Sequence, residues 1–213
     1  MTHGKTETIL LKRAYDAPDA RDGVRVLVDR LWARGVSKAA ARLDAWMHDL
    51  GPSDDLRTQF GHQPARWETF VAQYRDELLT PMRQVLLAML QGVSSNDTLT
   101  LVYGARDTRE NEAVVLRQYL LQERAHVPPG WDARATLLVA ITVVAAAHPD
   151  AVAPAASVER FIAPLLTRDD ITSARSTLLA DGEVQPASGG WELTGRGKKE
   201  VAGFQCAAAP APT

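Results

Sequence analysis

The first half of the chain contains three short apolar runs, each of which turns polar abruptly at its carboxyl end. Runs of aliphatic and β-branched residues of this length are typical of buried strands. In an open α/β sheet the carboxyl ends of parallel strands share one edge, and ligands bind there. We therefore predict an α/β domain with a small, mainly parallel sheet, flanking helices and a charged site at the carboxyl edge. The runs and the charged residues after them are residues 9–11 with Arg13 and Asp16, residues 24–28 with Asp29, Arg30 and Arg34, and residues 99–103 with Arg106 and Asp107.

Apolar residues at helical spacing predict the flanking helices. The clearest pattern covers residues 64–79, where aromatic and aliphatic side chains fall on one face. The other predicted elements are helices at residues 38–42, 56–60 and 80–91, a short strand at 43–47 and a loop at 92–97.

Asp107 and Glu110 have the spacing of a capping box, so we expect a helix to begin there. The free backbone N–H groups of such a helix start, together with Arg106, would favour an anion. This spacing adds to the prediction of an anion site at the sheet edge.

The pattern changes at Val127-Pro128-Pro129-Gly130, where two prolines and a glycine suit a linker. Helical spacing returns after it, and a glycine-containing turn between two short apolar runs predicts a β-hairpin. The elements are helices at 133–147, 157–163 and 171–180 and hairpin strands at 183–185 and 191–194. We therefore divide the chain into an α/β domain at 1–126, a linker at 127–131, a helical and hairpin domain at 132–205 and a disordered tail at 206–213.

The composition narrows the classes of protein to consider. The chain has 213 residues with a net charge of −2, so no global basic field attracts nucleic acid or acidic membranes. The single cysteine, Cys206, excludes an internal disulfide and fits a reducing compartment. The N-terminal residues lack the apolar segment of a secretory signal, and the most apolar run, residues 135–147, is too short to span a membrane. We expect a cytoplasmic protein without a membrane partner.

Several stretches of the first half together resemble a family of bacterial domains of unknown function typified by the YeaO proteins. The resemblance covers residues 8–124 and is carried mainly by residues 22–35, although Ala33 stands where the family has proline. The family has no settled activity, so the resemblance implies an α/β fold and no mechanism. The other matching pieces are residues 12–15, 43–46, 52–53, 56–57, 60–62 and 77–78, Trp67, Phe70, Tyr74 and residues 103–107.

Three helices followed by a hairpin are the element order of a winged helix-turn-helix. The second half is similar to winged helices of the MarR type over residues 131–204, on the strength of residues 178–184 and 191–199. Winged helices serve protein contacts as often as they bind DNA. The resemblance therefore implies DNA contact or protein contact.

The strand-end arginines are the main candidates for a binding site. Guanidinium groups pair bidentately with phosphate or carboxylate, so their convergence would build a pocket for a small anionic ligand. In the alternative interpretation each arginine pairs with Asp16, Asp29, Asp44 or Asp107 and only fixes loops. The candidate ligand-binding residues are Arg13, Tyr15, Asp29, Arg30, Arg34, Arg57, Tyr103, Arg106 and Asp107.

Three residues are candidates for acid–base catalysis. Asp29 and Asp107 follow strands, and His62 lies on a loop between helices within a matched motif. Structural roles, including helix capping by Asp107, are the alternative. The histidines are scattered without metal-ligand spacing and no phosphate loop or nucleophile elbow is present, so we expect neither a metal nor a cofactor.

DNA contact would fall on the second half. Helix 171–180 would present Thr172, Arg175 and Ser176 to a major groove. Arg196, Lys198 and Lys199 would meet phosphates from the wing. The strongly apolar helix 133–147 suggests a homodimer, since one small domain offers little surface to cover it.

Three functional hypotheses follow. The first is a ligand-responsive DNA-binding or regulatory factor with a small-anion pocket in the α/β domain. The second is an enzyme that acts on a phosphorylated or nucleotide-like substrate. The third limits the winged helix to dimerisation or protein contacts.

Overall fold

A computed structural model describes residues 8–125 and 127–207 of the chain, and the side chains of residues 8–125 and 127–204. The first half contains one four-stranded sheet in which every pairing is parallel and the strand order is β1-β4-β2-β3. The strands are β1 (Ile9–Arg13), β2 (Val24–Leu27), β3 (Ala45–Trp46) and β4 (Leu99–Tyr103). The predicted parallel α/β sheet is therefore confirmed.

Side-chain alternation decides which face of the sheet carries the core. Val24, Val26 and Val28 point to one face and are fully buried in the main hydrophobic cluster, which also contains residues of helices α4 (Pro81–Asn96) and α5 (Glu112–Gln122). Leu27 and Val102 point to the other face, where a smaller cluster is formed with residues from the loops and from α1 (Lys38–Ala41). The main core thus lies on one side of the sheet.

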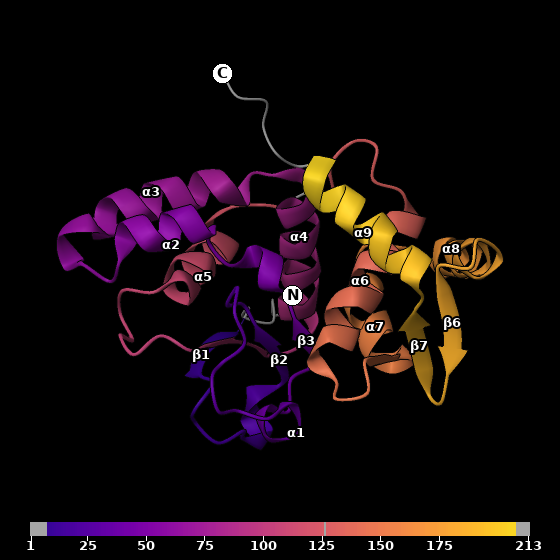
Figure 1. The fold of residues 1–213 in the computed structure, drawn as a ribbon, viewed down its shortest axis with the longest axis horizontal. Coiled ribbons are helices and arrows are strands. Elements are labelled where there is room, and N and C mark those ends of the chain that lie inside the picture. Colours follow the sequence, from indigo (N-terminus) through magenta and orange to yellow (C-terminus); the bar gives the residue numbers. More distant parts are fainter. Residues whose placement is uncertain (1–7, 126, 208–213) are drawn as a thin grey trace, which may run out of the picture.

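The helices of the first half follow the predicted pattern with one clear extension. They are α1 (Lys38–Ala41), α2 (Asp54–Phe60), α3 (Trp67–Leu78), α4 (Pro81–Asn96) and α5 (Glu112–Gln122). The side chain of Ser37 caps α1 as expected, and that of Ser53 caps α2. Helix α4 continues through the expected loop at 92–97, because Val93 and Ser94 are buried against the core. In Figure 1, α4 runs through the middle of the molecule, with α2 and α3 on one side and the C-terminal elements on the other.

The expected helix start at Asp107 is wrong. The Asp107 carboxylate does accept backbone N–H groups, from Arg109 at 2.8 Å and from Glu110 at 3.0 Å, but these bonds close a turn. Helix α5 begins at Glu112, and the side chain of Asn111 caps it by accepting the Val114 N–H. The first turn therefore carries the Glu112 carboxylate instead of an anion site beside Arg106.

The second half adds two elements that the sequence analysis did not anticipate. Its elements are α6 (Ala133–Ala147), β5 (Val152–Pro154), α7 (Ala155–Ile162), α8 (Arg168–Ala180), β6 (Val184–Ala187), β7 (Gly190–Leu193) and α9 (Gly195–Ala207). The three predicted helices and the hairpin are present, and the strands form an antiparallel sheet in the order β5-β7-β6. Strand β5 and helix α9 are the unanticipated elements. Helix α9 reaches Ala207, and residues 208–213 of the expected tail lie outside the described residues.

One continuous core joins the two halves. The main hydrophobic cluster includes residues from Ile9 in β1 to Val201 in α9. Helix α6 packs against β3 on one side and against α7 and α8 on the other. Helix α4 contacts α7, and Gly92 of α4 lies directly against Pro164. The predicted boundary at residues 127–131 thus separates two sequence segments that share a core.

This packing removes the reason for expecting a homodimer. Eleven residues of α6, from Ala135 to Ala147, are buried within the chain itself. Their apolar surface is covered by both halves, so α6 needs no second copy to cover it. The apolar surface of α6 would be exposed only in an isolated C-terminal domain. In the structure the first half of the chain covers part of it.

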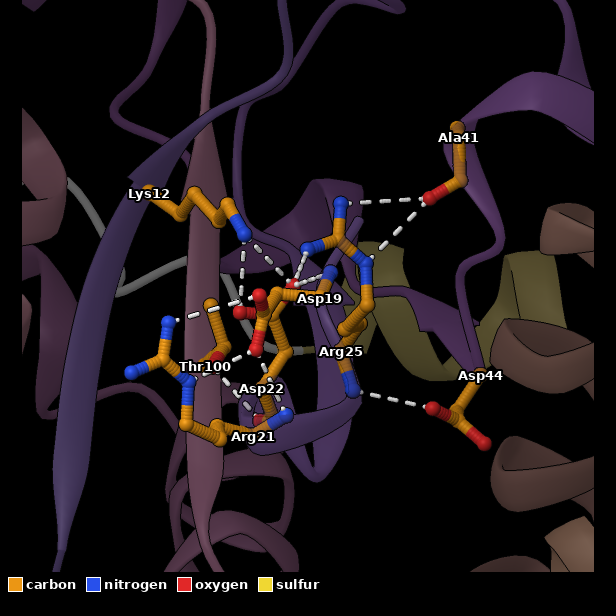
Figure 2. Close-up of polar contacts among 8 residues, drawn as sticks. All are labelled: Lys12, Asp19, Arg21, Asp22, Arg25, Ala41, Asp44 and Thr100. Atoms are coloured by element: carbon orange, nitrogen blue, oxygen red, sulfur yellow. Dashed lines mark hydrogen bonds and ion pairs between the residues drawn. The ribbon is translucent and has the colours of Figure 1, made fainter. Parts of the chain in front are cut away.

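A buried ionic cluster stabilises the second face of the sheet (Figure 2). Asp22 is 5% exposed, and its carboxylate accepts bonds from Lys12 at 2.9 Å and from the guanidinium of Arg25. Arg25, which is 4% exposed, also donates to the carbonyl of Ala41 at 3.2 and 3.3 Å. Burial alone would raise the pKa of Asp22, but the N–H of Asp19 and the two cations together lower it. The cluster therefore links α1 and β1 to β2 across the second face of the sheet, although β4 lies between β1 and β2.

Candidate functional site

A cavity of about 460 Å³ lies at the carboxyl edge of the parallel sheet. Its floor is formed by the segments that follow β2 and β4, and its walls come from α2, α3 and the start of α5. This is the position at which parallel α/β sheets bind ligands. Its lining residues are Asp29, Arg30, Leu31, Pro52, Arg57, Thr58, Phe60, His62, Phe70, Gly104, Ala105 and Glu112.

Asp29 lies at the floor of this cavity. Its Oδ2 accepts the backbone N–H of Gly104 at 2.8 Å, so the residue after β2 is fixed to the segment after β4. Its Oδ1 is buried and has no hydrogen-bond donor within the described part of the chain. A buried carboxylate oxygen without a donor costs free energy unless it carries a proton or meets a ligand.

The carboxylate of Glu112 faces Asp29 and explains how that cost is reduced. Burial first, and then the hydrogen bond and negative charge of Glu112, raise the pKa of Asp29 to about 9. The N–H of Gly104 and the charge of Arg57 oppose this rise without cancelling it. A buried carboxyl group beside a second carboxyl group holds its proton more tightly. At neutral pH Asp29 is therefore a neutral, protonated acid at the floor of the cavity.

Cationic groups surround the mouth of the cavity. Arg57 pairs with Asp54 at 2.6 Å, and Arg30 lies 3.8 Å from the same carboxylate. Both guanidinium groups remain partly exposed, and both line the cavity. The cavity thus combines an acidic floor with a basic mouth.

The position of His62 follows from the end of α2. Gly61 and His62 both have left-handed backbone conformations, with φ of +52° and +53°. Histidine is among the residues that adopt this region more readily than most. The resulting turn places the imidazole ring 5.5 Å from the ring of Phe60 and at the cavity wall.

The other predicted ligand-binding residues do not line this cavity. The Arg13 Nε donates to the Ala105 carbonyl at 3.0 Å, and its guanidinium lies 5.1 Å from the ring centre of Tyr15. Tyr103 is 3% exposed and belongs to the core. Arg34 and Arg106 are exposed, and Asp107 caps its own turn. The expected convergence of all five strand-end and loop arginines is therefore wrong, since only Arg30 and Arg57 reach the cavity.

The expected pairing partners also differ from those observed. Asp44 pairs with Arg160 of α7 at 3.2 Å and accepts the backbone N–H of Arg25 at 2.9 Å. Arg30 and Arg57 share Asp54 instead of the carboxylates proposed for them. The sequence analysis missed Glu112 as well. Only its position in the first turn of a helix could have indicated it, and the helix start had been placed at Asp107.

The candidate DNA-contacting residues occupy two separate elements. Thr172, Arg175 and Ser176 lie on α8, where the two hydroxyl groups donate to backbone carbonyls one turn earlier, at 2.9 and 3.0 Å. Arg196, Lys198 and Lys199 are exposed at the first turns of α9. The turn of the β6–β7 hairpin consists of Ser188 and Gly189, so the expected placement of these cations on that hairpin is wrong.

The described part of the chain contains neither a metal-ligand cluster nor a membrane-spanning helix. Within residues 8–125 and 127–207, no group of three or more His, Cys, Asp or Glu side chains is arranged to hold a metal ion. None of the helices in the same part of the chain combines the length and apolar character that crossing a bilayer requires.

The first half is an α/β domain with a parallel sheet and a charged cavity at the carboxyl edge of that sheet. A family model described as the inactive DUF488-N3 subclade matches residues 8–135, and the chain belongs to this family. The uncharacterised protein YeaO of Escherichia coli strain K12 is 38% identical over 112 residues, which is 53% of this chain and 96% of YeaO. The uncharacterised protein Rv3073c of Mycobacterium tuberculosis is 36% identical over 112 residues, 53% of this chain and 92% of that protein.

These matches confirm the YeaO-like resemblance of the first half. The family model ends at residue 135, so nearly all of the second half lies beyond it and the MarR-type resemblance has no support from it. No solved structure matches the chain.

Proposed function

We propose that this protein binds a small molecule in the cavity at the carboxyl edge and acts as a regulatory protein in the cytoplasm. The ligand carries a hydrogen-bonding polar group for Asp29 and Glu112 and an anionic group for Arg30 and Arg57. The single observation behind the proposal is the buried Oδ1 of Asp29, which lacks a donor and belongs to a residue that lines the cavity. A polar ligand group that accepts a hydrogen bond from the protonated Asp29 carboxyl group, or donates one to its unprotonated oxygen, would supply the missing bond.

The aromatic walls and the charge arrangement narrow the ligand further. Phe60 and Phe70 stack at 4.5 Å between ring centres and offer an apolar wall. A cavity of about 460 Å³ lies within the usual range for small-molecule sites. Nucleotides and amino acids both combine N–H groups with an anionic end, and these two classes are the ones that the cavity suits.

We favour binding over catalysis. The family model that matches the chain is described as inactive. A neutral Asp29 would also suit a general acid, which is the role that the enzyme hypothesis requires. Ligand binding explains the neutral Asp29 without requiring a nucleophile, and it agrees with the description of the family model as inactive.

The test is a thermal unfolding screen with nucleoside monophosphates, α-amino acids and inorganic phosphate. A ligand present at a hundredfold excess over its Kd stabilises a protein by about 2.7 kcal/mol, which is roughly 5–10 °C for a chain of this length. Asp29→Asn and Arg57→Gln are each expected to abolish the shift, whereas Arg34→Gln, an exposed arginine outside the cavity, keeps it. A shift that survives both cavity substitutions, or no shift with any compound, contradicts the proposal.

We propose in addition that the second half is a winged helix-turn-helix that contacts DNA through α8 and the start of α9. The order of elements from α6 to β7, with β5 between the first two helices, favours this interpretation. The outer face of α8 is exposed at Thr172, Arg175 and Ser176. The cations Arg196, Lys198 and Lys199 would then meet phosphates from α9.

Fluorescence polarisation with a mixed-sequence duplex at two salt concentrations tests this second proposal. Each lost phosphate contact lowers the slope of log K against log salt by about 0.9. The double variant Lys198→Gln/Lys199→Gln should therefore lower the slope by about 1.8, while Arg21→Gln in the first half leaves it unchanged. Equal affinity for wild type and the double variant would contradict DNA contact and favour the role in protein contacts or dimerisation.

A further inference from the structure

A second cavity of about 440 Å³ lies in the C-terminal half, far in sequence from the first and without a residue in common with it. It is enclosed by α6, α7, α8 and the β6–β7 hairpin. Ile141 of α6, Ile162 of α7 and Leu178 of α8 are buried and form its apolar interior. Helix α8 contributes few large buried side chains, because Ala174 and Leu178 are its buried residues.

The exposed side of this cavity carries two arginines that have no acidic partner. Arg168 and Arg175 are spaced two turns apart on α8 and both line the cavity. Among residues 8–125 and 127–204, neither guanidinium forms an ion pair with a carboxylate. By contrast, Arg134 and Arg160 in the same half pair with carboxylates of neighbouring elements.

An aromatic ring and a single carboxylate complete the cavity rim. The Arg175 guanidinium lies 6.0 Å from the ring centre of Trp191, which holds it over the cavity. Glu159 of α7 is the one carboxylate among the cavity residues, so its charged groups sum to one net positive charge. A net charge of this size matches a monoanion better than a dianion.

We propose that this cavity is a second ligand site and that it binds an apolar monocarboxylate, such as a medium-chain fatty acid or an aromatic acid. The apolar interior removes the hydrocarbon body from water, which is the main favourable term for such a ligand. Arg168 and Arg175 donate bidentate, charge-assisted hydrogen bonds to the carboxylate. The site does not depend on the ligand of the sheet-edge cavity, but it shares Arg175 with the proposed DNA contact of α8.

Isothermal titration calorimetry of the full chain with octanoate and benzoate tests the proposal, with octan-1-ol and octylammonium as probes matched in size. Octanoate is expected to bind at least about tenfold more tightly than octan-1-ol, since a charge-assisted hydrogen bond contributes that much. Octylammonium should not bind. Arg175→Gln and Arg168→Gln are each expected to weaken octanoate by about the same factor, while Arg117→Gln, an exposed arginine on α5, keeps the wild-type affinity.

A steric variant separates the cavity from the charged rim. Ile171 lines the cavity from a half-buried position on α8, so Ile171→Trp fills space without disturbing the deep core. This variant should fold with the circular dichroism of wild type and lose binding of both octanoate and benzoate. Failure of both acids to bind, equal binding of octanoate and octan-1-ol, or unchanged octanoate affinity in Ile171→Trp would each overturn the proposal.

Discussion

The backbone N–H of Gly104 donates to Oδ2 of Asp29 at 2.8 Å, and a Cβ on Gly104 would lie 2.8 Å from that same oxygen. The contact joins the ends of β2 and β4, which are neighbours in the sheet. Glycine at position 104 therefore allows the carboxylate to sit against the backbone and to turn its second oxygen away, where it is left without a donor. The acidic floor of the cavity depends on this close approach.

We predict that Gly104→Ala displaces the Asp29 carboxylate. The added methyl group is too close to Oδ2 for both to stay in place, and overpacking of this kind costs about 1–3 kcal/mol. Urea denaturation measures the loss, and the thermal screen should show that ligand stabilisation is lost as well. Gly203→Ala on α9 is the control, because a Cβ there has no neighbour within 4 Å and alanine favours a helix. Wild-type stability in Gly104→Ala would show that the carboxylate is free to move aside.

We predict a fall in stability with rising pH that depends on Asp29. Its pKa is raised from 3.8 to about 9 in the folded protein, so the native state keeps a proton that the unfolded chain has released. The stabilisation is fully present below about pH 4 and is lost as pH rises toward 9, by at most about 1.4 kcal/mol per pH unit. Urea denaturation between pH 5 and pH 8 measures this slope, and Asp29→Asn should flatten it.

A Glu112 variant shows how much of this pH dependence of stability comes from burial of Asp29 alone. Glu112→Gln removes the hydrogen bond and the negative charge of Glu112 but leaves the burial of Asp29, which is the largest cause of the raised pKa. This variant should therefore keep part of the slope. Identical pH profiles for wild type and both variants would mean that Asp29 is ionised at neutral pH.

We predict that the ionic cluster of Figure 2 is required for stability. Removal of one partner from a buried ion pair leaves an uncompensated charge and costs about 3–5 kcal/mol. Arg25→Met should approach this loss, because Asp22 is 5% exposed and retains only Lys12 as a cationic partner. Arg21→Gln, which breaks the exposed pair with Asp19, is the control and should unfold at the same urea concentration as wild type. Equal midpoints for Arg25→Met and wild type would contradict a stabilising role.

The sequence predicted the architecture well because its signals are local. The valine-rich run at 24–28 is buried whatever its neighbours do, and the alternation of turn and apolar residues located the hairpin at 184–193. Strand β5 and helix α9 were not predicted, because their signals are not local. Val152–Pro154 becomes a strand only because β7 lies beside it, and α9 begins with glycine and has few apolar residues. Their structure depends on tertiary contacts that no local pattern records.

The candidate site was predicted only in part, for a related reason. Asp29 was located because a strand end is a local feature, and Arg30 follows it directly in the sequence. The spacing of Asp107 and Glu110 predicts a helix capped by Asp107, but the cap is Asn111, four residues later. This shift places Glu112 in the first turn of α5, beside the cavity. The ionic role of Lys12 and Arg25 has no local signal, since their shared partner Asp22 lies in a stretch rich in turn residues and has the pattern of an ordinary loop residue.

The last prediction concerns the contact between the two halves. A Cβ on Gly92 of α4 would lie 2.4 Å from the Cβ of Pro164, whose ring cannot rotate aside. Gly92→Ala should therefore push α4 and the segment after α7 apart and cost about 1–3 kcal/mol, despite the better helix propensity of alanine. Because one core spans both halves, the loss should appear as a single transition at a lower urea concentration, by circular dichroism and by tryptophan fluorescence alike. A transition in which only one of the two signals moves would instead mean that the halves unfold independently.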